Sequence, residues 1–210
     1  MRLVVGSELQ NEFKQAELDR HLDAMSGFVE RARASGAPSP ACTMVLRSAH
    51  STPAQALILM KDALADAGVR VSVILAHVEP DDALRQLFAT LSALSPDAPA
   101  TALIRWACNP RLLDAHEQVT YGADMCWSGD AMRREADKRN PLVLFDMDAP
   151  EAAMLGTRAF TALWGASVSV PERHLLARTG AKPSGAYEQA QDAPITALRP
   201  NVQGWPLVRH

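Results

Sequence analysis

The pattern of apolar residues between positions 41 and 80 predicts a strand, a helix and a second strand. Residues 43–46 form a short apolar run with β-branched members, and residues 69–75 form another, as expected for two buried strands. Between them, apolar residues recur at helical spacing, at Leu57, Met60, Leu64 and Ala67. Gly68 then supplies the left-handed residue that often follows a helix. Together they predict a parallel βαβ unit with a right-handed crossover.

The helix of this unit is predicted to begin with a capping box. Thr52 is the expected capping residue, Pro53 suits the first helical position, and Gln55 lies three residues after Thr52. The segment His50-Ser51-Thr52 follows the carboxyl end of the first strand, where parallel sheets place ligands. Backbone N–H groups at a helix start can hold an anion, so His50, Ser51 and Thr52 are candidates for an anion-binding site. Helix capping alone explains these residues as well.

Similar patterns predict further elements on both sides of the unit. They are a short strand or loose arm at 1–7, helices at 8–34, 80–94 and 150–164, a short helix or turn at 109–115, and strands at 101–107, 117–121, 123–127, 142–145 and 168–170. The last forty residues contain five of the fourteen prolines and predict an extended tail, partly anchored by Trp205. The predicted fold is α/β, with a mixed, mostly parallel sheet flanked by helices on both faces. The expected divisions are an N-terminal helical arm (1–40), an α/β domain (41–170) and a Pro-rich tail (171–210).

Composition narrows the class of protein. The 210 residues are 48% hydrophobic and 21% charged, which is ordinary for a soluble protein with a full core. The net charge of −3 argues against wholesale electrostatic binding to nucleic acid or an anionic membrane, although a local basic patch that binds nucleic acid stays compatible with it. The sequence has neither a run of 18 apolar residues nor a signal-peptide core, so no membrane span and a cytoplasmic location are expected.

The three cysteines, Cys42, Cys108 and Cys126, show no C-x-x-C spacing. They are expected to be small buried thiols of a reducing compartment rather than a metal or redox site. Neither a metal nor a cofactor is predicted.

Residues 66–75, DAGVRVSVIL, and the order of the elements around them resemble one half of the phospholipase D superfamily. In that family this pattern closes the first βαβ unit, and a strand ending in acidic residues and a helix ending in Phe…Leu-Trp complete the half. Residues 145–151, FDMDAPE, and 160–164, FTALW, are similar to that final piece. The resemblance covers about residues 41–170. It implies phosphodiester chemistry, in which one histidine attacks phosphorus and a second, from another half or subunit, protonates the leaving oxygen.

The family motif H-x-K-x-x-x-x-D, followed by G-S-x-N, is degenerate in this sequence. None of the six histidines has Lys two residues later. Under the resemblance, His116 takes the place of the catalytic histidine and Gln118 that of the lysine, while the aspartate falls one residue out of place, near Asp124. Ser128 and Asp130, in WSGD, stand roughly where G-S-x-N is expected to hold the phosphate.

Replacing Lys with Gln removes a fixed positive charge from a site that must hold an anion. Arg133 or Arg134, in the polar loop that follows, are the candidates to compensate. A surface or hairpin-anchoring role also explains His116, and a role in a turn explains Ser128 and Asp130. The sequence therefore favours a catalytically degenerate phospholipase D-like domain, a pseudoenzyme that acts as a binding or assembly module.

Two alternatives stay open. One is a metal-independent phosphodiesterase or nuclease that acts through His116, and the other is a small-molecule or anion-binding α/β domain whose ligand, such as a phosphate, lies near residues 48–52. Active relatives use two halves, so a chain with one half predicts a homodimer, and an isologous dimer would bring His116 and its symmetry mate together. An enzyme predicts these rings in a polar, Arg-lined cleft, whereas a scaffold predicts that apolar side chains block this face.

A second resemblance concerns residues 142–148, LVLFDMD, which are similar to the haloacid dehalogenase motif, an apolar strand followed by D-x-D-x-T. In that family the first aspartate is a nucleophile on phosphate and the second an acid, with Mg²⁺ bound. Here Pro150 occupies the threonine position, and only 62 residues follow Asp148, too few for the rest of such a sheet. Asp146 and Asp148 are therefore expected to be solvated strand-end carboxylates that cap the next helix.

Overall fold

A seven-stranded mixed sheet forms the centre of the protein, in the order β6-β5-β4-β1-β2-β3-β7. The computed structural model describes residues 3–36, 40–133 and 144–176, all within the unit Met1–Ala177. The strands are β1 (Ala41–Leu46), β2 (Arg70–Leu75), β3 (Ile104–Trp106), β4 (His116–Tyr121), β5 (Met125–Ala131), β6 (Leu144–Asp146) and β7 (Val168–Ser169). The predicted tail, Trp205 and the loop residue Arg134 lie outside the described residues.

Parallel pairing is confined to the middle of the sheet. Strand β2 pairs in parallel with β1 and with β3, as the βαβ pattern predicts. The pairs β1–β4, β4–β5, β5–β6 and β3–β7 are antiparallel. The prediction of a mixed α/β sheet is confirmed, but the prediction of a mostly parallel one is wrong. The β4–β5 hairpin and β6 add successive antiparallel neighbours, and such strands need no crossover helix.

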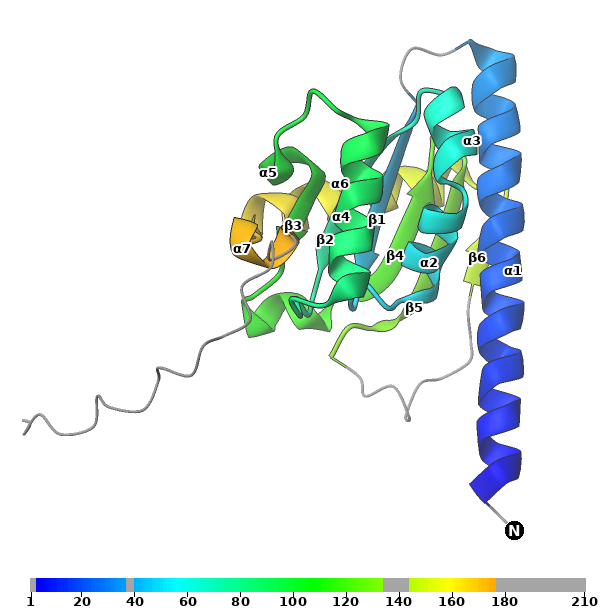
Figure 1. Cartoon of the computed structure of the whole chain (residues 1–210). Coiled ribbons are helices and arrows are strands. Elements are labelled where there is room, and N and C mark those ends of the chain that lie inside the picture. Colours follow the sequence, from blue (N-terminus) through cyan, green and yellow to red (C-terminus); the bar gives the residue numbers. More distant parts are fainter. Residues whose placement is uncertain (1–2, 37–39, 134–143, 177–210) are drawn as a thin grey trace, which may run out of the picture. The chain divides into compact units, whose positions relative to one another are not determined.

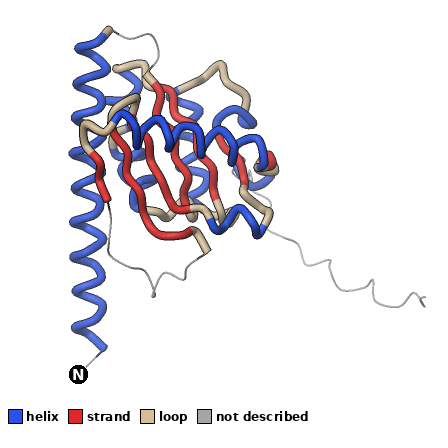
Figure 2. Tube along the Cα trace, turned by 180° about the vertical axis from the view of Figure 1, so that it is seen from behind, coloured by secondary structure: helices blue, strands red, loops and turns tan. Residues whose placement is uncertain are grey.

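Helices cover both faces of the sheet, as predicted. They are α1 (Leu3–Ser35), α2 (Thr52–Leu59), α3 (Lys61–Asp66), α4 (Asp82–Leu94), α5 (Ala100–Leu103), the 3₁₀ helix η1 (Pro110–Asp114), α6 (Pro150–Ala166) and α7 (Glu172–Leu175). Helices α1, α2 and α4 lie over one face (Figure 1), and the view from behind shows α6 crossing the other (Figure 2). None of the described helices is long and apolar enough to cross a bilayer.

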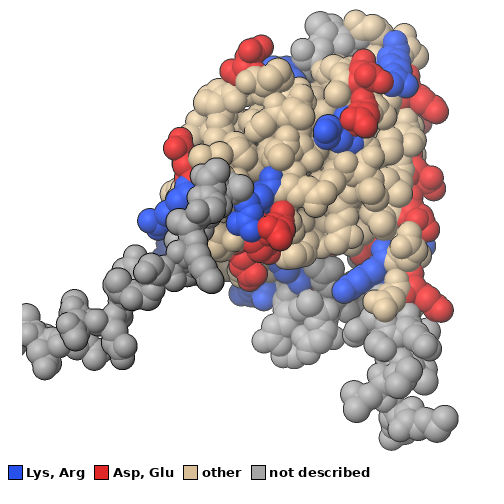
Figure 3. Space-filling model, viewed as in Figure 1, with Lys and Arg blue, Asp and Glu red and all other residues tan. Residues whose placement is uncertain are grey.

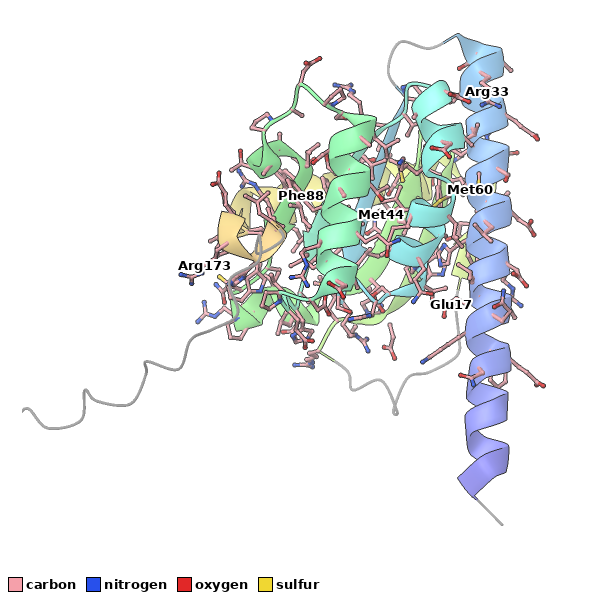
Figure 4. The ribbon with its side chains drawn as sticks, viewed as in Figure 1. Glu17, Arg33, Met44, Met60, Phe88 and Arg173 are labelled. Atoms are coloured by element: carbon pink, nitrogen blue, oxygen red, sulfur yellow. The ribbon has the colours of Figure 1, made fainter. Side chains whose placement is uncertain are left out.

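Alternation along the strands builds one core on each face. Met44 of β1 and Val73 of β2 belong to the larger cluster, which also holds residues of α1, α2 and α4, and Figure 4 labels Met44 between α4 and α2. Val45 of β1 and Ile74 of β2 point the other way, into a smaller cluster that includes Phe160 of α6. Because both faces are buried, the central strands are continuous apolar runs rather than alternating ones.

Helix α1 has 33 residues, roughly 50 Å at the usual rise per residue. Its predicted extent over 8–34 is confirmed, but residues 3–7 continue the helix and are neither a strand nor a loose arm, because extending an existing helix adds one hydrogen bond for each residue fixed. Phe28 and Met25 are buried against the sheet, whereas residues 11–16 are all exposed. The N-terminal part of α1 runs past the end of the sheet (Figure 1).

Some predicted elements, and the burial of one cysteine, differ in detail from the structure. The single helix predicted after Thr52 is divided at Met60, whose backbone (φ −91°, ψ 6°) departs from helical values, into α2 and α3. Residues 100–103, which follow Pro99, form α5 and shorten the strand predicted at 101–107 to Ile104–Trp106. Cys42 and Cys126 are buried as predicted, but Cys108 is exposed because it lies in the loop after β3.

Candidate functional site

The carboxyl end of β1 carries a buried polar cluster formed by Arg47, Ser51 and Glu117. Glu117 is only 3% exposed, and its Oε1 accepts hydrogen bonds from the Arg47 amide (2.9 Å) and the Ser51 hydroxyl (2.8 Å). The Arg47 guanidinium lies 3.7 Å from the other carboxylate oxygen and donates to the carbonyl oxygen of Ala131 (3.0 Å). The cluster therefore links the loop after β1 to β4 and β5, and its carboxylate is held by donors rather than left bare.

The side chains predicted to bind an anion after β1 are engaged with other parts of the protein. Ser51, not Thr52, is the N-cap residue of α2, and it makes no capping hydrogen bond because its hydroxyl bonds Glu117. Thr52 donates to Glu17 of α1 (3.3 Å), and Gln55 bonds the carbonyl of His50 (3.3 Å), so the predicted capping box does not form. Figure 4 shows Glu17 on α1 at the level of α2.

His50 is 60% exposed, and its Nε2 lies 2.7 Å from a carboxylate oxygen of Asp81. Asp81 is the N-cap residue of α4, and its other oxygen accepts a hydrogen bond from the Leu84 amide (2.9 Å). Partial burial opposes ionisation of Asp81, but the bonds from Leu84 and His50 outweigh it and lower the pKa of this carboxyl. His50 is thus tied to a capping carboxylate, a role that favours helix stability over anion binding.

His116, the predicted catalytic histidine, is the first residue of β4 and is exposed. Its Nδ1 lies 2.9 Å from the carbonyl oxygen of Gly129, and only a protonated Nδ1 can bond a carbonyl. A neutral ring therefore leaves the lone pair on Nε2, the nitrogen that a nucleophilic histidine would use. His116 is thus held in a competent tautomer, at an open surface.

Gln118, which stands at the lysine position of the resemblance, lies under α6. Its side-chain amide donates to the Thr120 hydroxyl (3.1 Å). A Cβ atom added at Gly156 of α6 would clash with the Gln118 amide nitrogen and come within 2.8 Å of the Thr120 hydroxyl oxygen. Gly156 therefore lets α6 rest directly on β4, and this contact closes the position where the family needs a phosphate-binding lysine.

The remaining predicted residues lie on or just after β5, the strand that pairs with β4 beside His116. Ser128 and Asp130 lie within β5, not in the turn that was expected to end it, because β5 stays paired with β4 as far as His116 opposite Ala131. Asp130 accepts a hydrogen bond from the next amide in the chain (2.8 Å). Arg133 forms an exposed ion pair with Asp114 of η1 (2.7 Å).

Asp146 and Asp148, from the second resemblance, are both exposed. Neither caps α6, since the N-cap residue is Ala149 and it receives no side-chain cap. Among the described residues, no group of three His, Cys, Asp or Glu side chains is arranged to hold a metal.

A buried histidine that the sequence patterns did not single out joins α1 to the sheet. His21 is fully buried, with Nδ1 2.7 Å from the Tyr121 hydroxyl and its ring edge-on to Trp127 at 4.7 Å between centroids. Burial lowers the pKa of His21 to about 3 and raises that of Tyr121, so both are neutral near pH 7. The histidine tautomer decides which of the two groups donates the hydrogen bond between them. The signal was available, because His21 lies at helical spacing between Leu18 and Met25.

A groove of about 930 Å³ lies between α1 and α6, at the amino end of β1. Its lining is largely apolar and includes Phe28 of α1 and Met154 of α6, with Arg31 and Arg158 as the cationic side chains. Arg31 pairs with Asp124 at 3.4 Å. Asp124, near which the family's aspartate was expected, lines this groove, whereas His116 and residues 50–52 do not.

Comparisons with known proteins leave the family open. A scan against protein-family models finds no match, and searches of the curated proteins and of the solved structures find none of significance. The order βαβ, helix, strand, hairpin, strand, helix is the order that the resemblance to phospholipase D implies. Other α/β folds share that order, so it shows the fold class alone.

Proposed function

We propose that the protein is a catalytically degenerate phospholipase D-like domain that acts as a binding or assembly module. The observation that carries this proposal is the unpacked part of α1. Residues 11–16 are all exposed, and the aromatic ring of Phe13 is 66% exposed on a helix that continues into the core. Figure 3 shows acidic and basic side chains along the edge formed by α1.

An unpacked helical segment needs a source of stability. Most helical stability in proteins comes from packing an apolar face, and residues 11–16 extend a packed helix without burying side chains of their own. Within the described residues the segment has only local support, such as the hydrogen bond from Gln15 to Asp19 one turn on (2.8 Å). A partner that covers Phe13 would supply the missing packing, which is how helical recognition elements work.

The surroundings of His116 support a module over an enzyme. Phosphoryl transfer needs donors that hold the anion, but the lysine position is Gln118, packed beneath α6. The Arg47 amide and the Ser51 hydroxyl bond the carboxylate of Glu117, the residue next to His116, and this carboxylate would repel a phosphate. Among the described residues, His116 thus has a competent tautomer, while the lysine position beside it carries no positive charge.

Hydrolysis of bis(p-nitrophenyl) phosphate without added metal tests this assignment against the phosphodiesterase alternative. The full chain, His116→Ala and the control His50→Ala are compared. We expect no release of nitrophenol above background from any of them. Turnover that His116→Ala abolishes and His50→Ala retains would establish catalysis at His116 and overturn the proposal.

A further inference from the structure

The outer face of α6 is an apolar surface that no described residue covers. The opposite side of this helix packs on the sheet through Ala153 and Phe160. On the outside, Leu155 is 61% exposed and Met154 46%, and Met147, in the turn before α6, is 57% exposed. Large apolar side chains that lie together on a surface usually mark an interaction site.

The only charged residues of α6 flank this apolar pair. Glu151 and Arg158 lie three residues before Met154 and three after Leu155, so the four side chains fall on one face of the helix. Seven residues correspond to about 10 Å along a helix axis, too far for these two charges to pair with each other. Within the described part of the chain, neither has an ion-pair partner.

We propose that this α6 patch, formed by Glu151, Met154, Leu155 and Arg158, binds the same patch on a second copy of the chain. The two α6 helices would run antiparallel about a twofold axis that passes between Met154 and Leu155. The apolar side chains of both copies then meet at the axis. The inference rests on the proposed function, and it names the partner and the surface.

Charge complementarity favours a second copy over other occupants. In the antiparallel arrangement Glu151 of each copy faces Arg158 of the other, so both ion pairs form by symmetry. The patch itself is neutral and the chain carries a net charge of −3, a balance that does not favour an anionic lipid surface. An unrelated partner would have to reproduce the same alternation of charges.

The neighbouring groove enlarges the contact. Met154 and Arg158 also line the groove whose far wall includes Phe28 of α1. A stable interface buries about 800 Å² on each partner, more than a short helix contact supplies by itself. The patch and the groove together offer a continuous surface to the second copy.

Sedimentation equilibrium of the full chain over a range of micromolar concentrations tests the proposal. The wild type is expected to dimerise. E151R and R158E each place like charges at both symmetric contacts and should weaken dimerisation by about tenfold. An equimolar mixture of E151R and R158E should restore it, because their heterodimer has two opposite-charge contacts. Circular dichroism confirms that the variants fold.

Leu155→Asp is a further variant and should leave the chain monomeric at every concentration used. A wild type that is monomeric throughout, a dimer that Leu155→Asp leaves unchanged, or a mixture no tighter than its components would each overturn the proposal. None of these results bears on catalysis at His116 or on binding through Phe13. The proposed function as a binding module is therefore tested separately from the dimer.

Discussion

The carboxyl end of β1 and the outer faces of helices α1 and α6 differ in character. At the carboxyl end of β1, Arg47, Ser51 and Glu117 are buried and bond one another. On the outer faces of α1 and α6, Phe13 and Leu155 are more than half exposed, at 66% and 61%. The Glu117 carboxylate is already held by its donors and has little left to offer a ligand, whereas uncovered apolar groups gain by meeting a partner. Among the described residues, the strand-end carboxylate is thus committed to internal contacts, whereas the helix surfaces leave large apolar side chains uncovered.

Changing one glutamate in each region tests this difference with the largest expected effect. Glu117→Ala removes the acceptor of a buried cluster, and we expect a loss of about 3 kcal/mol in the free energy of unfolding. Glu151→Ala, on the exposed face of α6, is the matched control and should change stability by less than about 0.5 kcal/mol in the monomer. Urea denaturation at low protein concentration measures both. Equal losses would contradict the division into a structural and a recognition region.

A smaller effect on the free energy of unfolding is expected from His21, which joins α1 to the sheet and makes the fold sensitive to acid. The folded-state pKa of His21 is about 3, below the 6.5 of an unperturbed histidine, so the unfolded chain binds more protons between these values. His21 therefore stabilises the fold fully above about pH 6.5, and this contribution is lost as the pH falls toward 3.

Between pH 7 and pH 5 this loss amounts to about 2 kcal/mol in the free energy of unfolding. His21→Gln does not titrate and retains an acceptor for the Tyr121 hydroxyl, so most of the difference between the two pH values should disappear. Urea denaturation of the wild type and of His21→Gln, each at pH 7 and at pH 5, measures this difference. A wild-type difference that persists in His21→Gln would show that another group is responsible.

The fold was largely predictable where apolar periodicity is strong. Strands β1 and β2, the start of α6 at Pro150 and the left-handed Gly68 (φ 64°) all follow their sequence signals. The sheet order was not predictable, because β4 reaches β1 and β7 reaches β3 through contacts between distant segments. The same short apolar runs suit parallel and antiparallel partners alike.

The candidate site was less predictable, because sequence spacing fixes which residues are near one another only within an element. Glu117 had a readable signal, since it alternates inward with Val119 and Tyr121 along β4, and an acid at such a position needs a buried partner. That its partners are Arg47 and Ser51, 70 and 66 residues away, depends on the whole sheet. The sequence identified Gln118 as standing at the lysine position of the family motif. No local pattern predicted that Gly156 of α6 would pack against it.

One binding experiment tests most directly whether the protein is a module that binds through Phe13 rather than through the site around His116. The full chain and three variants, Phe13→Asp, Asn11→Asp and His116→Ala, are used to capture proteins from the source cells, with quantitative mass spectrometry of what is retained. Asn11→Asp adds the same charge as Phe13→Asp at another exposed position of α1. We predict partners that are retained by wild type, Asn11→Asp and His116→Ala and lost with Phe13→Asp. Retention that Phe13→Asp leaves unchanged, or that His116→Ala abolishes, would contradict the account.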